Sequence, residues 1–318
     1  MNLYATDLKS RFQEGRVVRV MAMGDSLTSG TGGTSGWRGP LKRIMSAWGY
    51  SNWEYVGSQT SNPDELGEYV RDWRHEGYGG TTVAQLTSTV RARVATFRPD
   101  LIILVAGTNS PPGQDRAGAR ADFNAWFTEA FADQNLRVLS VSRPPQKSSE
   151  NWLVDGVMEP VVQGHKDAVR DQQNLGRAVV YAGSHDLLRV GWSPLWYQPS
   201  DNTHFNRIGY ARLAGVMARA LVGGPSGAMA GTLTERPVGS TLLSSVATDQ
   251  DFPFGATVKK SVTSDAVRVL TWRGETVDIP TTWPAHTPWP VPIVRVLSTG
   301  TTLTGPLILS TFAPGVLI

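Results

Sequence analysis

A serine, a histidine and an aspartate in this sequence have the types and spacing that nucleophilic catalysis requires. Ser26 lies in the segment GDSLTSG, directly after an apolar run that ends at Met23. A serine hydroxyl attacks a carbonyl carbon efficiently only when a base accepts its proton. His204 is a candidate base, because Asp201 stands three residues before it and a carboxylate at that spacing can orient an imidazole. The chemistry that this set would perform is acyl transfer.

Two glycine- or amide-containing segments could stabilise the oxyanion that such an attack creates. The segment GYGGTT precedes a predicted helix, and its glycines let backbone N–H groups approach a ligand closely. Asn109 follows the apolar run LIILVA, so its side-chain amide would lie at the same edge of a parallel sheet as Ser26. Taken one at a time, each segment is also typical of a plain turn or cap, and D-x-x-H alone is typical of a surface arrangement.

The elements that must position these residues alternate along the chain. Short apolar runs at 17–23, 53–56, 101–106, 137–142 and 178–182 indicate strands, and segments of helical character lie between them, at 82–97, 119–134 and 161–173. A last amphipathic segment at 207–221 ends before a Gly-Gly pair. This order predicts a three-layer α/β/α domain with a parallel sheet, whose strand ends carry the candidate residues.

The composition changes after residue 223. A Gly/Pro/Ser-rich stretch is followed by alternating Val, Thr and apolar residues with no helical pattern, which is typical of a small all-β domain. We therefore predict an α/β domain at 1–224, a linker at 225–245 and a small β domain at 246–318.

Composition also excludes several classes of protein. The net charge of +3 is spread over the 318 residues without a basic block, so nucleic acid is not an expected partner. The chain has no cysteine, which excludes a disulfide scaffold, a thiolate metal site and a cysteine nucleophile. It has no run of about 18 apolar residues and no apolar core of a signal peptide near its N-terminus, so we expect neither membrane insertion nor Sec export.

Tryptophan is unusually frequent, with 11 residues. Aromatic side chains near the candidate site could stack on sugar rings or could simply pack in the core. The candidates for substrate contacts are Trp192, Trp196, Tyr197, Trp37 and Trp73. Both alternatives stay open for them.

The blocks GDSLTSG, EGYGGTT, VAGTN and DNTHF occur in this order over about residues 16–223, and this set resembles the SGNH hydrolases, also called the GDSL esterase/lipase superfamily. The resemblance implies that Ser26 is the nucleophile, that His204 is the base and that Asp201 orients it. It also implies an oxyanion hole formed by the Ser26 N–H, Gly80 and Asn109.

The same resemblance implies a flavodoxin-like doubly wound sheet and a reaction that needs no metal or cofactor. Because the second block contains a doubled glycine, Gly79 competes with Gly80 for the oxyanion role. HEGYGGTT is similar to the second block of carbohydrate acetyl esterases. Ser110, followed by two prolines, departs from the acidic residue that many members carry after the third-block asparagine, and this indicates a different loop beside the substrate.

The C-terminal segment, about residues 246–311, resembles a small β domain of spike-base proteins from tailed phages and gene transfer agents. This resemblance implies a place on the surface of a virion or phage-like particle that is released by lysis. Other spike, capsid or tail proteins are then the expected protein partners, and a homo-oligomer is the expected assembly.

Three functions follow from these observations. The leading prediction is a serine esterase that removes O-acetyl groups from host surface polysaccharide as a spike or fibre component. The alternative is a non-catalytic, capsule-binding adhesin with a vestigial site. An ordinary lipase or thioesterase would be expected to show an export signal or an apolar acyl channel, and neither is visible in the sequence.

Overall fold

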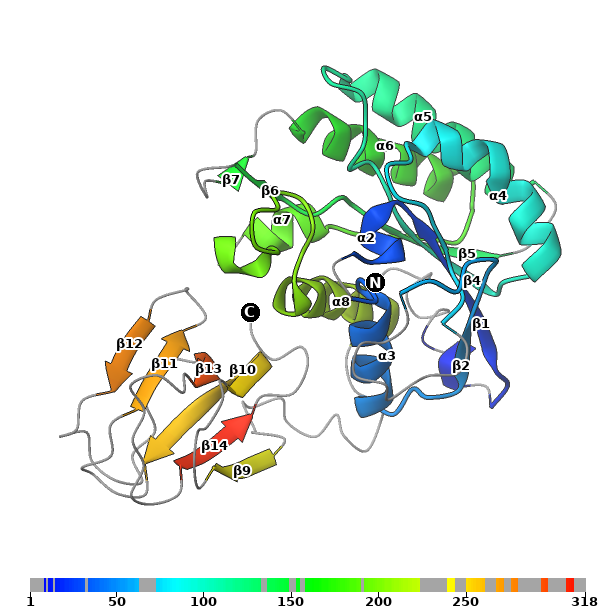
Figure 1. The fold of residues 1–318 in the computed structure, drawn as a ribbon. Helices are drawn as coiled ribbons and strands as arrows, with labels where there is room; N and C mark the ends of the chain where they lie inside the picture. The colour runs from blue at the N-terminus through cyan, green and yellow to red at the C-terminus, as the bar shows by residue number, and fades with distance from the viewer. Residues whose placement is uncertain are drawn as a thin grey trace. The chain divides into compact units, whose positions relative to one another are not determined.

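The chain divides into two compact units, one of Met1–Val190 with Trp196–Met229 and one of Gly191–Leu195 with Ala230–Ile318 (Figure 1). The computed structural model describes residues 9, 11–13, 15–31, 34–62, 73–132, 136–148, 153–154, 158–189, 192–223, 239–243, 250–260, 267–271, 276–279, 293–296 and 307–311.

A parallel sheet forms the centre of the first unit. Its strands are β1 (Val18–Gly24), β2 (Trp53–Val56), β4 (Leu101–Val105), β5 (Arg137–Val141) and β8 (Val179–Ala182). They lie in the order β2-β1-β4-β5-β8, and every neighbouring pair is parallel. Numbered along the chain, these five strands have the order 2-1-3-4-5, which is the flavodoxin-like doubly wound arrangement. The predicted fold class is confirmed.

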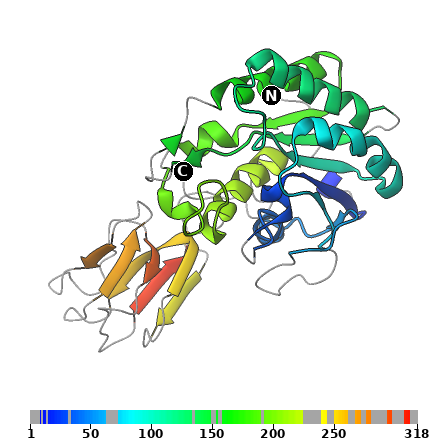
Figure 2. The same ribbon diagram turned by 45° about the horizontal axis from the view of Figure 1, so that its top comes forward.

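Helices cover both faces of this sheet (Figures 1 and 2). One layer contains α3 (Arg38–Ala47) and α8 (Arg207–Val222), and the other contains α4 (Val83–Phe97), α5 (Arg116–Ala130) and α6 (Glu159–Asn174). All five residues of β4 are buried because side chains from both of its faces enter a core. This burial on both faces explains why the strands appear in the sequence as continuous apolar runs and not as an alternation of apolar and polar residues.

Local capping explains where the helices begin. Thr82 caps α4 in a capping box with Gln85, so the helix starts one residue after the predicted boundary. Asp115 accepts a hydrogen bond from the Gly118 N–H at 2.7 Å, and α5 therefore starts earlier than predicted. The prediction also placed the end of α5 four residues too late.

Short elements complete the carboxyl edge of the sheet. The nucleophile candidate begins α2 (Ser26–Ser29), and β3 (Glu76–Gly77) pairs with the end of β1 in parallel register, with Gly24 opposite Gly77. The strand order reverses between β1 and β4, which is where open α/β sheets bind ligands. The remaining elements of this region are β6 (Gln146–Lys147), β7 (Leu153–Val154), α7 (Ser184–Arg189) and the 3₁₀ helix η1 (Pro194–Trp196).

From Ala230 on, the described residues of the second unit form β-strands. They are β9 (Gly239–Leu243), β10 (Gln250–Lys260), β11 (Val267–Thr271), β12 (Thr276–Ile279), β13 (Ile293–Val296) and β14 (Leu307–Thr311). They form one antiparallel sheet in the order β12-β11-β13-β10-β14-β9. β9 falls within the stretch predicted as a linker, most of which lies outside the described residues. Across the described helices, none is long and apolar enough to cross a membrane.

Candidate active site

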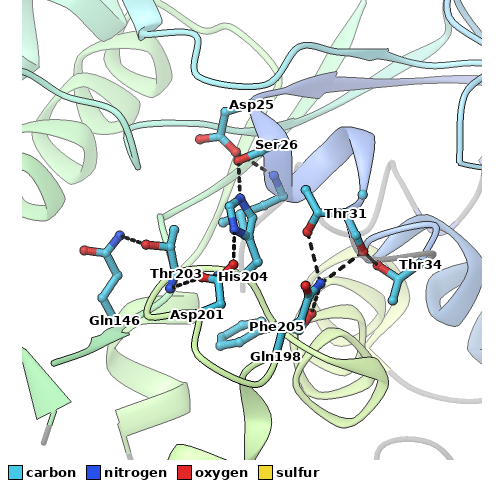
Figure 3. Close-up of polar contacts among 12 residues, drawn as sticks. Asp25, Ser26, Thr31, Thr34, Gln146, Gln198, Asp201, Thr203, His204 and Phe205 are labelled. Carbon is cyan, nitrogen blue, oxygen red and sulfur yellow. Dashed lines mark hydrogen bonds and ion pairs between the residues drawn. The ribbon is translucent and has the colours of Figure 1, made fainter. Parts of the chain in front are cut away.

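Ser26, His204 and Asp201 form a continuous chain of hydrogen bonds at the carboxyl edge of the sheet (Figure 3). The Oγ of Ser26 lies 2.8 Å from Nε2 of His204. The Nδ1 of the same ring lies 2.7 Å from Oδ2 of Asp201. Two segments 178 residues apart in the sequence therefore meet with the geometry of a nucleophile, a base and an orienting carboxylate.

Asp201 is fixed by its own loop. Its Oδ1 accepts the backbone N–H groups of Thr203 and His204, both at 2.8 Å. Partial burial alone would raise the pKa of Asp201, but these amides and the imidazole hold the pKa below its ordinary value. An ionised carboxylate favours the His204 tautomer with the proton on Nδ1, which leaves Nε2 to accept the serine proton.

The turn that carries Ser26 requires a close approach of two strands. Gly24 has φ +155°, and a Cβ at this position would lie 2.0 Å from the Val105 carbonyl oxygen. The next residue, Asp25, caps α2 by accepting the Leu27 N–H at 3.0 Å. Ser26 is the first residue of that helix, so its N–H has no intrahelical acceptor. This free amide is what the predicted oxyanion donor requires.

Asp25 is a fully buried carboxylate beside the nucleophile. Burial raises the pKa of Asp25 above the ordinary carboxyl value. The Leu27 amide, Thr108 and the charge of Arg143 act in the opposite direction. The sequence reasoning did not single out Asp25, although its place before the serine was visible.

Arg38 holds the other end of α2, and the sequence reasoning missed it. The buried guanidinium donates to the carbonyl oxygens of Thr28 at 2.9 Å, Ser29 at 3.0 Å and Trp73 at 2.9 Å. It therefore connects the nucleophile helix with the chain that leads into the second block. Arg38 begins α3, which also contains Lys42 and Arg43, so its position in the sequence carried no signal that set it apart.

The second block is positioned by a buried glutamate. Glu76 accepts the N–H of Ser58 and the hydroxyl of Tyr78, each at 2.5 Å, and pairs with Arg93 at 3.2 Å. The Tyr78 N–H donates to the Gly24 carbonyl at 2.9 Å. These contacts bring the turn that contains Gly79 and Gly80 to the end of β1.

The third block meets the second through a side chain. The Nδ2 of Asn109 donates to the Thr81 carbonyl at 3.1 Å. In the same turn Thr81 N–H bonds the Tyr78 carbonyl at 3.3 Å, and Gly80 has φ +76°, as the third residue of a type II turn requires. Ser26, Gly80 and Asn109 thus come from adjoining segments, and their joint role as oxyanion donors stays a prediction.

Gln198 is a third residue that the sequence reasoning missed. Its Nε2 donates to both oxygens of Thr31 at 3.0 Å and to the Phe205 carbonyl at 3.2 Å (Figure 3). Because Thr31 follows the nucleophile segment, this amide fastens the histidine loop to it. A glutamine has too many common roles for its position alone to have indicated this contact.

Of the two alternatives for the five aromatic candidates, burial favours packing in the core for four of them. These four have 6% or less of their surface exposed: Trp37, Trp73, Trp196 and Tyr197. Trp37 donates to Thr28 Oγ1 at 3.2 Å and Tyr197 donates to the Pro145 carbonyl at 2.7 Å. These rings support the site from within, because burial favoured packing over sugar stacking. Trp192 is half-buried, and its contact with substrate stays a prediction.

The described residues contain no group of three or more His, Cys, Asp or Glu side chains that could hold a metal ion. The assembled groups are instead a hydroxyl, an imidazole, a carboxylate and neutral amides. This set can transfer a proton and stabilise an oxyanion.

Comparison with known proteins agrees with the order of the blocks. The profile of the GDSL-like lipase/acylhydrolase family matches residues 22–212. A multidomain esterase of Ruminococcus flavefaciens is 28% identical over 217 residues, which are 62% of this chain and 27% of that protein. The chain thus spans about a quarter of the length of that relative.

Two solved structures have a similar fold. A family 3 carbohydrate esterase of Clostridium thermocellum superposes with a TM-score of 0.52 at 22% identity, covering 65% of this chain and 96% of its own. A carbohydrate esterase of family 3 from Talaromyces cellulolyticus gives a TM-score of 0.52 at 22% identity, with 65% and 97% covered.

Proposed function

The chain belongs to the GDSL-like lipase/acylhydrolase family, and from this premise we propose that it is a serine esterase that removes acetyl groups from a polysaccharide. One observation carries the proposal, the hydrogen-bonded series from Ser26 Oγ through His204 to Asp201, with distances of 2.8 and 2.7 Å. A non-catalytic site does not require a serine hydroxyl, an imidazole and an ionised carboxylate to lie within hydrogen-bonding distance of one another.

The reaction follows from these groups. Ser26 Oγ attacks the ester carbonyl carbon while Nε2 of His204 accepts the hydroxyl proton. The oxyanion receives hydrogen bonds from the Ser26 N–H, the Gly80 N–H and Asn109 Nδ2. The C–O bond to the sugar breaks and the sugar oxygen takes the proton from His204. Water then attacks the acetyl-serine, again with His204 as base, and acetate leaves with Ser26 restored.

The choice of a carbohydrate ester rests on likeness. The family 3 carbohydrate esterases of Clostridium thermocellum and Talaromyces cellulolyticus share the fold, and the second block HEGYGGTT is similar to that of carbohydrate acetyl esterases. Both features favour an acetylated polysaccharide over a lipid as substrate.

The proposed place of action is a phage-like particle, where the esterase would act on the surface polysaccharide of the host. The support is the resemblance of about residues 246–311 to spike-base proteins, together with the β-sheet to which the described residues of that segment contribute strands. Fractionating particles and blotting for the chain tests this part separately. Absence from purified particles would remove the particle role and leave the esterase proposal unaffected.

Acetate release from an acetylated surface polysaccharide tests the enzymatic proposal. We expect release by the parent chain and none by Ser26→Ala, whereas a p-nitrophenyl ester with a long acyl chain should be a poor substrate. If the parent releases no acetate but both proteins bind the polysaccharide, the adhesin alternative holds. Preference for the long-chain ester would instead indicate a lipase.

A further inference from the structure

Asp25 joins the nucleophile helix to the neighbouring strand. Its Oδ1 accepts the Leu27 N–H at 3.0 Å, and its carbonyl accepts the N–H groups of Thr28 and Ser29, both at 3.0 Å. Its own N–H donates to the Val105 carbonyl at 3.3 Å. Since β4 ends at Val105 and leads to Asn109, Asp25 contacts two of the three segments that supply the predicted oxyanion donors.

The side chain of Asp25 also faces Thr108, the residue before Asn109. The hydroxyl and the amide of Thr108 both act on the Asp25 carboxylate. Within the described part of the chain, the buried Oδ2 of Asp25 and the buried Oγ1 of Thr108 each have no hydrogen-bond partner. The carboxylate oxygen is an acceptor and the hydroxyl is a rotatable donor, so each can supply the partner that the other lacks.

Arg143 supplies the balancing charge. It follows β5 at the same edge of the sheet and is 1% exposed. Asp25 is the foremost charge that acts on its guanidinium. Its Nε and Nη1 have no hydrogen-bond partner among the described residues. A buried guanidinium and a buried carboxylate are each costly alone, and each makes the other tolerable.

We propose that Asp25 is a positioning residue whose carboxylate, balanced by Arg143, sets the placement of Asn109 relative to Ser26. The inference rests on the proposed esterase function. It goes beyond helix capping, because asparagine and aspartate cap helices about equally well and a cap needs no charge.

Asp25→Asn in the full chain separates the two roles. Asparagine keeps an oxygen for the Leu27 N–H but offers Thr108 no charged acceptor. Asp115→Asn is the matched control, because Asp115 caps α5 by the same kind of contact, to the Gly118 N–H at 2.7 Å, and has no part in the proposed chemistry. With p-nitrophenyl acetate we expect Asp25→Asn to lower kcat about ten- to a hundredfold with KM nearly unchanged, and Asp115→Asn to lower neither.

Two further measurements make the inference specific. In an Asn109→Ala background, Asp25→Asn should cost less than about threefold in kcat, since it acts through that amide. Arg143→Met should lower kcat as Asp25→Asn does, while Arg143→Lys, which keeps the charge, should recover part of the rate. The two Arg143 variants test the inference even if circular dichroism shows that Asp25→Asn is unfolded.

Three results would each overturn the inference. One is full activity of a folded Asp25→Asn variant, and another is full activity of Arg143→Met. The third is a loss of kcat in the double variant that equals the product of the losses in the two single variants. In those cases the parent still hydrolyses the ester, so the proposed function stands. A parent chain without any hydrolysis would instead overturn the proposed function and this inference with it.

Discussion

Hydrogen bonds to Asp201 determine whether His204 can act as a base. The carboxylate accepts two backbone amides and the imidazole Nδ1. The loop thereby fixes both the rotamer of the ring and the nitrogen that faces Ser26.

Asp201→Asn tests that frame. The new amide group would donate toward Nδ1 and favour a proton on Nε2, where it blocks acceptance of the serine proton. We expect kcat for p-nitrophenyl acetate to fall about a thousandfold or more, with the far-ultraviolet circular dichroism unchanged. A folded variant that keeps about a tenth or more of the parent rate would contradict the assignment.

Among the elements, the turn between β3 and α4 gives Gly79 and Gly80, the two adjacent glycines of the second block, different backbone conformations. A Cβ at either position would meet open space, but only Gly80 has a positive φ, at +76°. Gly80→Ala should therefore lower stability by about 1 kcal/mol and shift the nearby N–H groups, with a clear loss of kcat. Gly79→Ala is the matched control and should be close to the parent. The reverse order of effects, measured by urea unfolding and by rate, would assign the role to Gly79.

The interface of α6 with the sheet should make the protein sensitive to acid. His165 is buried, bonds Ser140 Oγ at 2.6 Å and stacks on Phe123 at a ring distance of 3.8 Å. Burial lowers the pKa of His165 from 6.5 to about 3. Between about pH 6.5 and pH 3 the imidazole is therefore protonated in the unfolded chain but not in the folded chain. The contribution of His165 to the free energy of unfolding is complete above about pH 6.5 and is lost as the pH falls toward 3.

Between about pH 7 and pH 4.5 this histidine alone should remove about 2.5 kcal/mol from the free energy of unfolding. Urea unfolding at the two pH values measures the loss. In His165→Gln, the difference between the two pH values should shrink by about that amount. An unchanged difference would show that His165 is not the group responsible.

The hydrophobic periodicity of the sequence and its capping residues were enough to predict the helices and strands whose bounds depend on local sequence. Strand β2 was predicted at its exact bounds, and the start of α4 was missed by only one residue, because apolar runs and a Thr82 cap are visible in the sequence. The contacts of Arg38 and Gln198 were not predictable, since most of their partners are carbonyl oxygens, which every residue carries. The aromatic residues near the site were ambiguous because tryptophan serves cores and sugar surfaces alike.

At the scale of the whole molecule, the proposed chemistry belongs to one unit. Ser26, Gly80, Asn109, Asp201 and His204 all lie in the unit that ends at Met229. Its parallel sheet has both faces covered by its own helices. The all-β unit supplies none of these five residues.

Truncation after Met229 tests this division of labour. We expect the shortened chain to fold and to hydrolyse p-nitrophenyl acetate with a kcat/KM within about threefold of the full chain, since the unit that ends at Met229 holds all five residues of the proposed chemistry. Loss of hydrolysis by a fragment that circular dichroism shows to be folded would mean that the β unit completes the site.

The central claim is that Ser26 is the nucleophile of an esterase. The most direct measurement is the rate of p-nitrophenyl acetate hydrolysis by the full chain and by Ser26→Ala, prepared side by side. The account predicts hydrolysis by the parent and a loss of about a thousandfold or more in the variant. A variant that hydrolyses the ester as fast as the parent would contradict it.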